Sequence, residues 1–309
     1  MTVTPESTDT VDSSSSDAGY NPNASSCTAA AAADDAATDT IEEMSHAAKV
    51  QKTQDQMNAI AEAIQQSQAL TSTPLPIESL LPQYIETNNQ YFLLGIDYLT
   101  KQYQYLRTTR GDGNCFYRAV WYQLCDMLLN DKDGEGQRLL KFIKEDSMKM
   151  ATTQGGYDEL ALEIFYDAMV EFLEALVNGN LTQEQLHEQL TEEGGISEYC
   201  TWYSRALTAT WCKAHADRFL PYLEEPFEDV AQFCASQIEP VGSEATMVAI
   251  VAFAECFRVT VSIEYLDGHA FDPAQGLTNH ILGDADASKL QLTLLYRPGH
   301  YDILYRKNK

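Results

Sequence analysis

Residues 110–120 read RGDGNCFYRAV, a glycine-containing turn that leads directly into an apolar segment. Gly111 and Gly113 give the backbone the freedom that a sharp turn requires. Beyond the turn, large apolar side chains recur at the four-residue spacing of a buried helix face: Phe116, Val120, Leu124 and Leu128. The stretch therefore predicts a core helix whose first turn holds Cys115.

Cys115 is the residue of this stretch that suggests chemistry. In the first turn of a helix, the unpaired N–H groups and the macrodipole favour an anion, so the position favours a thiolate over a thiol. The same N–H groups can hold a developing oxyanion. Most free cysteines, however, are small buried hydrophobes. This stretch alone leaves a nucleophile and a core residue equally open.

A candidate base lies near the other end of the chain, in RPGHYDILYR (297–306). His300 stands at the entry to a predicted last strand, and Asp302 follows two residues later. Side chains at positions i and i+2 of a strand point to the same face, so Asp302 can bond one imidazole nitrogen while the other faces a thiol. Nucleophilic catalysis needs such a base and orienting group. Alone, the pair fits a polar hairpin turn with a solvated histidine better.

The rest of the chain predicts helices first and strands late. Helical patterns occur over 88–106, 158–176, 197–220, 226–238 and 244–257. Alternating β-branched and aromatic residues predict strands over 259–266, 290–296 and 301–306, the last two joined by the turn RPGH. This order predicts an α+β domain with a mainly antiparallel sheet.

Two of these helices carry more detailed predictions. The apolar positions at helical spacing in 158–176 are Leu160, Ile164, Phe165, Phe172 and Leu176. Thr182 and Gln185 fit a capping box at the start of another helix. His280 is expected in a loop before the last strands.

The first 75 residues differ in composition from the rest. Residues 1 to about 40 are mostly small and polar, so they cannot bury enough surface to fold and are predicted to be disordered. Residues 41–70 have helical composition with sparse apolar positions, which predicts a marginal helix or one that docks on a partner. TSTPLP at 71–76 reads as a linker. The folded domain is therefore predicted over 76–309.

Charge and cysteine usage exclude several classes of function. The net charge of −26, from 46 acidic and 20 basic residues, opposes binding to nucleic acid or an anionic membrane and suits a basic or neutral protein partner. No apolar run of about 18 residues predicts a membrane span, and the N-terminus lacks the pattern of a secretory signal. Seven scattered cysteines without a CxxC motif indicate reduced thiols in the cytosol or nucleus, with no zinc site.

Together, RGDGNCFYRA and YRPGHYDILYR resemble the otubain family, the ovarian-tumour (OTU) type of cysteine deubiquitinase. The resemblance covers roughly residues 80–309 and includes IEPV (238–241) and the strand VTVSIEYL (259–266). It implies a papain-like OTU cysteine protease domain, in which a helical subdomain packs on a small, mainly antiparallel sheet. It also implies that no metal or organic cofactor is needed.

The resemblance implies a role for each motif residue. Cys115 would be the nucleophile, His300 the general base and Asp302 the orienting acid. Asp112 matches the acid of the family's DGNC motif, whose loop shapes the oxyanion hole, and we favour backbone shaping over proton transfer for it. The oxyanion loop also contains Gly113 and Asn114.

The implied activity is hydrolysis of ubiquitin isopeptide bonds in conjugates or polyubiquitin chains, with a preference for the chain type that marks proteins for the proteasome. The expected partners are ubiquitin, its chains and ubiquitin-conjugating enzymes, in the cytoplasm and also the nucleus. An alternative is a module that inhibits by holding ubiquitin or a loaded conjugating enzyme without cleavage, with residues 41–70 as the docking arm. Redox sensing through Cys115 can coexist with either.

The other cysteines are assigned to structure. Cys125, Cys234 and Cys256 lie in apolar helical stretches, and Cys200 and Cys212 share a helix with two tryptophans, so all five are predicted in the core. Cys27 lies in the segment predicted to be disordered.

Overall fold

The computed structural model describes residues 31–283 and 289–307. A boundary between Met57 and Asn58 divides the chain into two compact units, and the long helix α1 (Ala31–Ser67) crosses it. Disorder was predicted for residues 1 to about 40: residues 1–30, with Cys27, lie outside the described residues, but residues 31–40 form the start of α1, so that part of the prediction was wrong. The helix expected at 41–70 is present as part of α1.

The second unit is an α+β fold, as predicted. Its helices are η1 (Ile77–Leu80), α2 (Leu81–Tyr84), α3 (Gln90–Gln102), α4 (Cys115–Leu128), α5 (Glu135–Phe142), the π-helical η2 (Ile143–Ser147), α6 (Met148–Thr153), α7 (Glu159–Val177), α8 (Gln183–Thr191), α9 (Ile196–Ala214), α10 (Ala216–Phe219), η3 (Leu220–Tyr222), α11 (Val230–Phe233), the π-helical η4 (Cys234–Ile238) and α12 (Met247–Phe257). Its strands are β1 (Tyr103–Arg107), β2 (Thr260–Tyr265), β3 (Asn279–Leu282), β4 (Gln291–Arg297) and β5 (His300–Arg306).

The five strands form one sheet in the order β1-β5-β4-β2-β3. Only the β2–β4 pair among these neighbours is parallel, so the sheet is mainly antiparallel, as expected. The central strands β4 and β5 are covered on both faces, because successive side chains point to opposite sides. Leu294 and Ile303 join the larger hydrophobic core, whereas Leu295 and Leu304 join a smaller one with α3.

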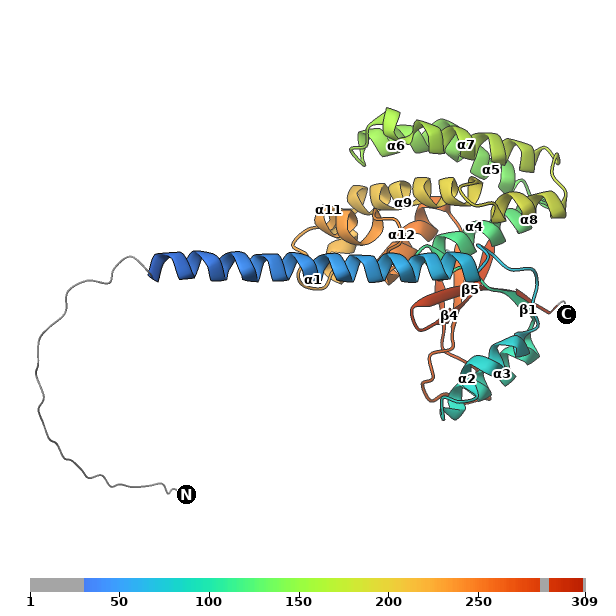
Figure 1. The fold of residues 1–309 in the computed structure, drawn as a ribbon. Coiled ribbons are helices and arrows are strands. Elements are labelled where there is room, and N and C mark those ends of the chain that lie inside the picture. Colours follow the sequence, from blue (N-terminus) through green and yellow to red (C-terminus); the bar gives the residue numbers. More distant parts are fainter. Residues whose placement is uncertain (1–30, 284–288, 308–309) are drawn as a thin grey trace, which may run out of the picture. The chain divides into compact units, whose positions relative to one another are not determined.

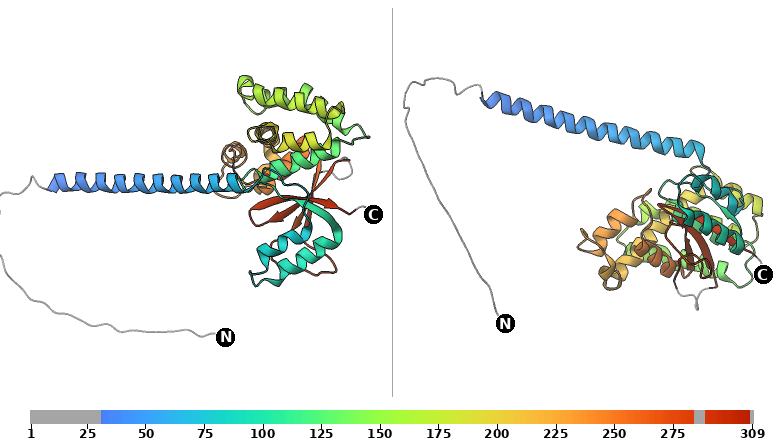
Figure 2. Two further views of the ribbon diagram at one scale, coloured as in Figure 1. Left: turned by 45° about the vertical axis from the view of Figure 1, so that its right-hand side comes forward. Right: turned by 90° about the horizontal axis from the view of Figure 1, so that it is seen from below.

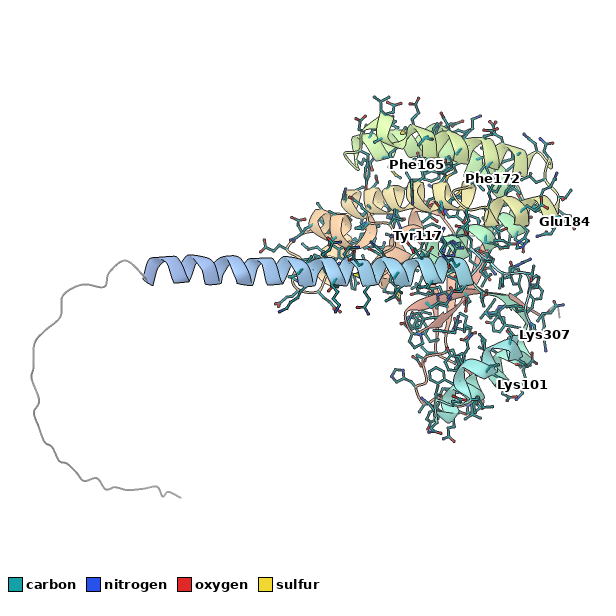
Figure 3. The ribbon with its side chains drawn as sticks, in the orientation of Figure 1. Lys101, Tyr117, Phe165, Phe172, Glu184 and Lys307 are labelled. Carbon is teal, nitrogen blue, oxygen red and sulfur yellow. The ribbon has the colours of Figure 1, made fainter. Side chains whose placement is uncertain are left out.

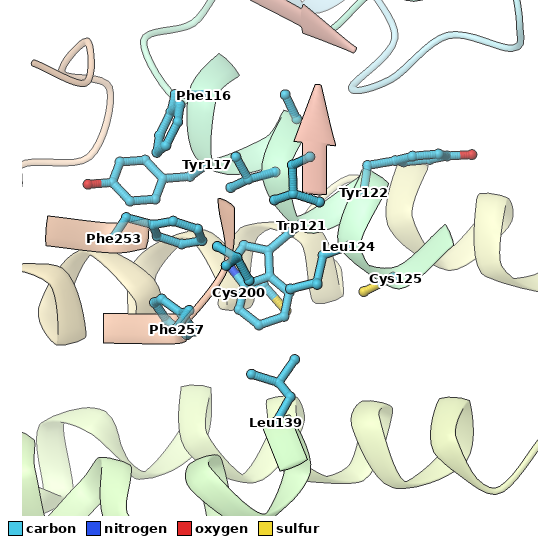
Figure 4. Close-up of a cluster of buried hydrophobic side chains, with 14 of the residues drawn as sticks. Phe116, Tyr117, Trp121, Tyr122, Leu124, Cys125, Leu139, Cys200, Phe253 and Phe257 are labelled. Carbon is cyan, nitrogen blue, oxygen red and sulfur yellow. The ribbon is translucent and has the colours of Figure 1, made fainter. Parts of the chain in front are cut away.

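Figures 1 and 2 show the resulting layers of the second unit: α2 and α3 on one side of the sheet, and α4 with the other large helices on the opposite side. The larger core centres on α4, as its apolar spacing predicted, and Figure 4 shows Trp121 between Phe257, Cys200 and Leu139. The Trp121 and Phe257 rings meet edge to face with centroids 5.6 Å apart. This core fixes the helix that carries Cys115. The five cysteines assigned to structure are buried, as predicted.

Two sheet strands were missed. The predicted helix 88–106 ends at Gln102, and Tyr103–Arg107 is the edge strand β1, paired with β5. Residues 279–282, expected in a loop, form β3 along β2, so His280 lies on a strand with its ring 4.9 Å from that of Tyr265. In both places the pairing partner is far away in the sequence, and local propensity cannot detect it.

The stretch 71–76 is not a linker. Thr71 bridges to Thr109 and Leu75 to Leu106, and Leu70 is only 1% exposed. The backbone of this segment therefore continues the sheet at its β1 edge, so packing begins before Pro76, where the domain was expected to start.

Helix α7 lies near its predicted bounds, and Phe172 and Leu176 are buried as predicted, but two other predicted core positions are exposed. Leu160 and Ile164, predicted at apolar positions, are 77% and 59% exposed, whereas Leu162, Met169 and Leu173 are buried. Phe172, labelled in Figure 3, is buried as predicted. The capping box of Thr182 and Gln185 is present at the start of α8.

The two faces of α7 should differ strongly in their contribution to stability. Leu173→Ala removes a fully buried side chain and should lower the free energy of unfolding by about 2–5 kcal/mol. Leu160→Ala, on the exposed face of the same helix, should change it by less than about 0.5 kcal/mol. Urea unfolding followed by circular dichroism measures both, and equal effects would contradict this assignment of the buried face.

Candidate active site

Cys115 is the first residue of α4, and Asn114 is its N-cap. The amide of Cys115 has no acceptor within the helix, as for any first-turn N–H. The side chain is only 1% exposed and contacts the larger core. The sulfur therefore lies at a helix N-terminus whose orientation the apolar core determines.

The structure brings His300 and Asp302 to Cys115. His300 Nε2 lies 2.9 Å from Asp302 Oδ1. Burial by itself lowers the pKa of His300, but the effects of Asp302 and of the neighbouring Cys115 outweigh burial and raise the pKa to about 9. At neutral pH the imidazole is therefore a cation placed between a carboxylate and the sulfur.

Asp302 is held by more groups than the sequence indicated. Its side chain is fully buried, and its Oδ2 accepts from Arg297 Nε at 2.8 Å and Nη2 at 2.6 Å. Its Oδ1 also accepts the Thr109 N–H at 3.0 Å. Sequence reasoning missed both partners. Arg297 could have been found, because the short turn of the hairpin places it opposite His300.

The Asp112 carboxylate shapes the turn before α4. Its Oδ1 accepts the Asn114 N–H at 3.0 Å, and both oxygens bind Arg118 of α4, at 2.9 and 2.7 Å. Burial alone would raise the pKa of Asp112, but Arg118 and the Asn114 amide lower it, so the group is an anion at neutral pH. Its contacts are with the backbone and an arginine of the loop, which fits backbone shaping.

Gly113 and Asn114 join the turn to the segment that follows IEPV. Gly113 has φ +78°, and a Cβ there would lie 1.8 Å from the carbonyl oxygen of Gly242. Asn114 Oδ1 accepts the Gly242 N–H at 2.9 Å. The two backbones approach so closely that only glycine fits at position 113.

Two hollows lie beside the hairpin that carries His300. One, of about 630 Å³, is lined by Gln68, Thr108, Gly111, Arg297 and His300 among others. The other, of about 470 Å³, is lined by Glu244, Tyr265, Asp267, Tyr296 and Tyr301 among others. The first reaches the base from one side, and the second lies beside the hairpin that carries it.

The arrangement supports nucleophilic chemistry. A cysteine sulfur at a helix N-terminus, a protonated imidazole beside it and a buried carboxylate behind the imidazole can act as a nucleophile, an acid and an orienting group. Among residues 31–283 and 289–307, no group of three or more His, Cys, Asp or Glu side chains could hold a metal ion. Within the same ranges, none of the helices is long and apolar enough to cross a membrane.

Comparison with known proteins gives consistent matches. The family model described as Peptidase C65 Otubain matches residues 34–306. The "Ubiquitin thioesterase otubain-like" protein of Caenorhabditis elegans is 33% identical over 256 residues, which cover 82% of this chain and 88% of that protein. "Ubiquitin thioesterase OTUB1" of Homo sapiens is 32% identical over 253 residues, or 81% of this chain and 88% of that protein.

Solved structures agree with these matches. The structure of h/ceOTUB1 with ubiquitin aldehyde and UBCH5B~Ub has a TM-score of 0.75 and 31% identity, over 84% of this chain and 99% of that chain. A ceOTUB1 complex with ubiquitin aldehyde and UBC13~Ub has a TM-score of 0.73 and 32% identity, over 82% of this chain and 99% of that chain.

Replacing Gly113 should break the turn that precedes α4. Gly113→Ala adds a Cβ that collides with Gly242 and a positive φ that alanine tolerates poorly, so we expect a loss of about 2–4 kcal/mol of stability. Gly156→Ala is a matched control, because Gly156 has φ +77° but open space around its Cβ position. Its cost should be only about 1–2 kcal/mol. Equal losses in thermal unfolding would show that the close approach to Gly242 is unimportant.

Proposed function

This chain belongs to the otubain family of cysteine peptidases, and on that premise we propose that it hydrolyses the isopeptide bonds that join ubiquitin to conjugates or to other ubiquitins. The observation that carries the proposal is that Asp302 bonds the His300 imidazole, that Cys115 acts on the pKa of the same imidazole, and that Cys115 lies at the N-terminus of α4. The family match covers most of the chain and includes all three residues.

Each residue has a role in the proposed reaction. The Cys115 thiolate attacks the carbonyl of ubiquitin's C-terminal glycine, and the carbonyl oxygen becomes an oxyanion near the N–H groups at the start of α4. The His300 imidazolium gives its proton to the departing lysine amine, so the C–N bond breaks and an acyl-enzyme remains. A water molecule, deprotonated by His300, then releases ubiquitin. Asp302 orients the ring throughout, and Asp112 holds the loop.

The hollow that contains Glu244 and Asp267 supports a basic protein substrate. Both carboxylates line it together with three tyrosines, and the whole chain carries a net charge of −26. Such a surface attracts positively charged groups. The preference for the chain type that marks proteins for the proteasome stays part of the proposal, and it needs cleavage data on defined linkages.

A second candidate function is binding of a ubiquitin-loaded conjugating enzyme without cleavage. The similar h/ceOTUB1 and ceOTUB1 structures contain UBCH5B~Ub or UBC13~Ub. In this chain, the exposed apolar side chains Leu160 and Ile164 on α7 offer a surface that a protein partner can cover. The two functions are compatible, because only the first needs the Cys115 sulfur.

The proposed nucleophile is tested with a ubiquitin whose C-terminus carries an electrophile. Wild type should form a covalent adduct and cleave at least one of a set of linkage-defined di-ubiquitins, whereas Cys115→Ala should do neither. Absence of adduct and cleavage in a folded sample that still binds ubiquitin would refute the protease function. The linkages that are cut would reveal the chain preference.

The binding function is tested with Cys115→Ser in a chain-synthesis assay that contains a conjugating enzyme. Inhibition by this inactive variant, and its loss when residues 41–57, the part of this segment outside the second unit, are deleted, would support a docking arm. Leu160→Asp and Ile164→Asp should weaken the inhibition if α7 takes part. If the inactive variant does not inhibit, cleavage is the better-supported function.

The activity should also fall at high pH, with a midpoint set by the pKa of His300. Because His300 must be protonated to release the amine and its pKa is raised to about 9, kcat/KM for di-ubiquitin should fall as the pH rises through about 9. In Asp302→Asn, burial is no longer offset by the carboxylate, so this midpoint should move down toward or below the ordinary histidine value of 6.5. Asp97→Asn, at an exposed ion pair with Lys101, is the control and should leave the profile unchanged. An unchanged midpoint in Asp302→Asn would refute the assignment.

A further inference from the structure

Arg205 of α9 lies behind the turn that carries the proposed nucleophile. The side chain is only 1% exposed. Its guanidinium donates hydrogen bonds to four oxygen atoms. They are Gly113 O at 3.1 Å, Asn114 Oδ1 at 2.9 Å, Ser243 O at 2.7 Å and Ile238 O at 2.9 Å. One side chain thus binds both the oxyanion loop and the segment that packs against it.

The charge of Arg205 has no carboxylate partner within ion-pair distance among the residues that the structure describes. Asp112 is the nearby carboxylate, but both of its oxygens already bind Arg118. The guanidinium carbon lies 4.4 Å from the Tyr117 ring centroid, and the buried Nε has no hydrogen-bond partner. A buried cation is costly unless another charge compensates it.

The anion that can compensate Arg205 is Cys115. Cys115 is the first residue of α4 and directly follows Asn114, whose Oδ1 accepts a hydrogen bond from Arg205, so a negative charge on Cys115 would act on Arg205. Burial lowers the pKa of Arg205. An arginine remains charged in proteins under all ordinary conditions. Its charge is therefore a fixed part of the field at the sulfur.

Most of the other charged groups around Cys115 already have a partner of opposite charge. Arg118 pairs with Asp112, Arg297 pairs with Asp302, and the His300 imidazolium faces the thiolate. The remaining charge that touches the loop is Arg205. Other titratable groups at this site are Arg110, beside Asp112 and paired with Glu193, and Tyr301 with Glu244 near it.

We propose that Arg205 is a positioning residue that fixes the oxyanion loop through four hydrogen bonds and whose buried positive charge favours the Cys115 thiolate and the oxyanion formed beside it. The planar fork of a guanidinium is needed to reach oxygens on both segments at once, which an ammonium cannot do. The inference rests on the proposed role of Cys115 as nucleophile, but the charge effect is measurable without any ubiquitin substrate.

Two variants separate the charge from the hydrogen bonds. Arg205→Gln is neutral and can still donate hydrogen bonds, whereas Arg205→Lys keeps the charge but loses the fork. The readout is the rate at which iodoacetamide alkylates Cys115, followed by mass spectrometry as a function of pH. Arg205→Gln should move the midpoint of this curve upward by about 1–2 pH units, and Arg205→Lys should move it by less than about half a unit.

Arg138→Met is the matched control for loss of a structural arginine. Arg138 also binds backbone carbonyl oxygens, those of Phe257 and Arg258, but it is paired with Glu135. This variant should leave the alkylation midpoint and kcat/KM unchanged. Both Arg205 variants should lower kcat/KM for di-ubiquitin, by about 10²-fold or more in Arg205→Gln. Thermal unfolding identifies variants that are not folded.

The outcomes are distinct. An unchanged midpoint in folded Arg205→Gln, or an equal shift in Arg138→Met, overturns the charge role. If Arg205→Gln does not fold, the NMR signal of Arg205 Nε in wild type replaces it: the signal should move with pH in wild type and not in Cys115→Ser, and a flat curve in wild type overturns the proposal. If alkylation responds as expected but wild type cleaves no ubiquitin substrate, the proposed function fails and the role of Arg205 at the thiolate stands.

Discussion

The buried contact between Asp302 and Arg297 is the interaction on which the site depends. Asp302 is fully buried, so its negative charge needs a partner, and Arg297 supplies that partner from the adjacent strand. The same carboxylate accepts the Thr109 N–H and bonds His300. It thereby ties the last hairpin to the chain just before the turn that leads into Cys115. It acts together with direct packing of α4 on β5, where the Phe116 and Tyr301 rings meet.

The second constraint is the close approach of two backbones at Gly113 and Gly242. The turn before α4 and the segment after η4 can approach each other only because position 113 has no side chain. Asn114 and Arg205 then bind across the approach. The Asp302 contact sets the position of the base, and this second contact sets the position of the N–H groups around the sulfur. Two separate regions of the fold therefore position His300 and the N–H groups around the Cys115 sulfur.

Local sequence predicted the elements whose stability is local. The apolar spacing of α4, the capping box of α8 and the three late strands were all present in the structure. Predictions were wrong where a distant partner decides the outcome. Residues 103–107 follow a helix directly and were predicted as part of it, but they form a strand that pairs with β5. Residues 71–76 have the composition of a linker, but they form bridges to the residues of the sheet edge. On α7, Phe172 and Leu176 are buried as predicted, but Leu160 and Ile164 are exposed although they have the spacing of a core face.

The sequence by itself determined that Cys115 begins a helix after a glycine turn and that His300 and Asp302 share one face of a strand, because both patterns are short-range and follow from backbone geometry. It also carried the two motifs that indicate the family. Only the tertiary structure decided that Cys115 and His300 lie together, that Arg297 and Thr109 hold Asp302, and that Arg205 lies buried behind the oxyanion loop with no carboxylate at ion-pair distance among the described residues. These contacts join residues far apart in the chain, and a buried charge can be identified only when the groups that surround it are known.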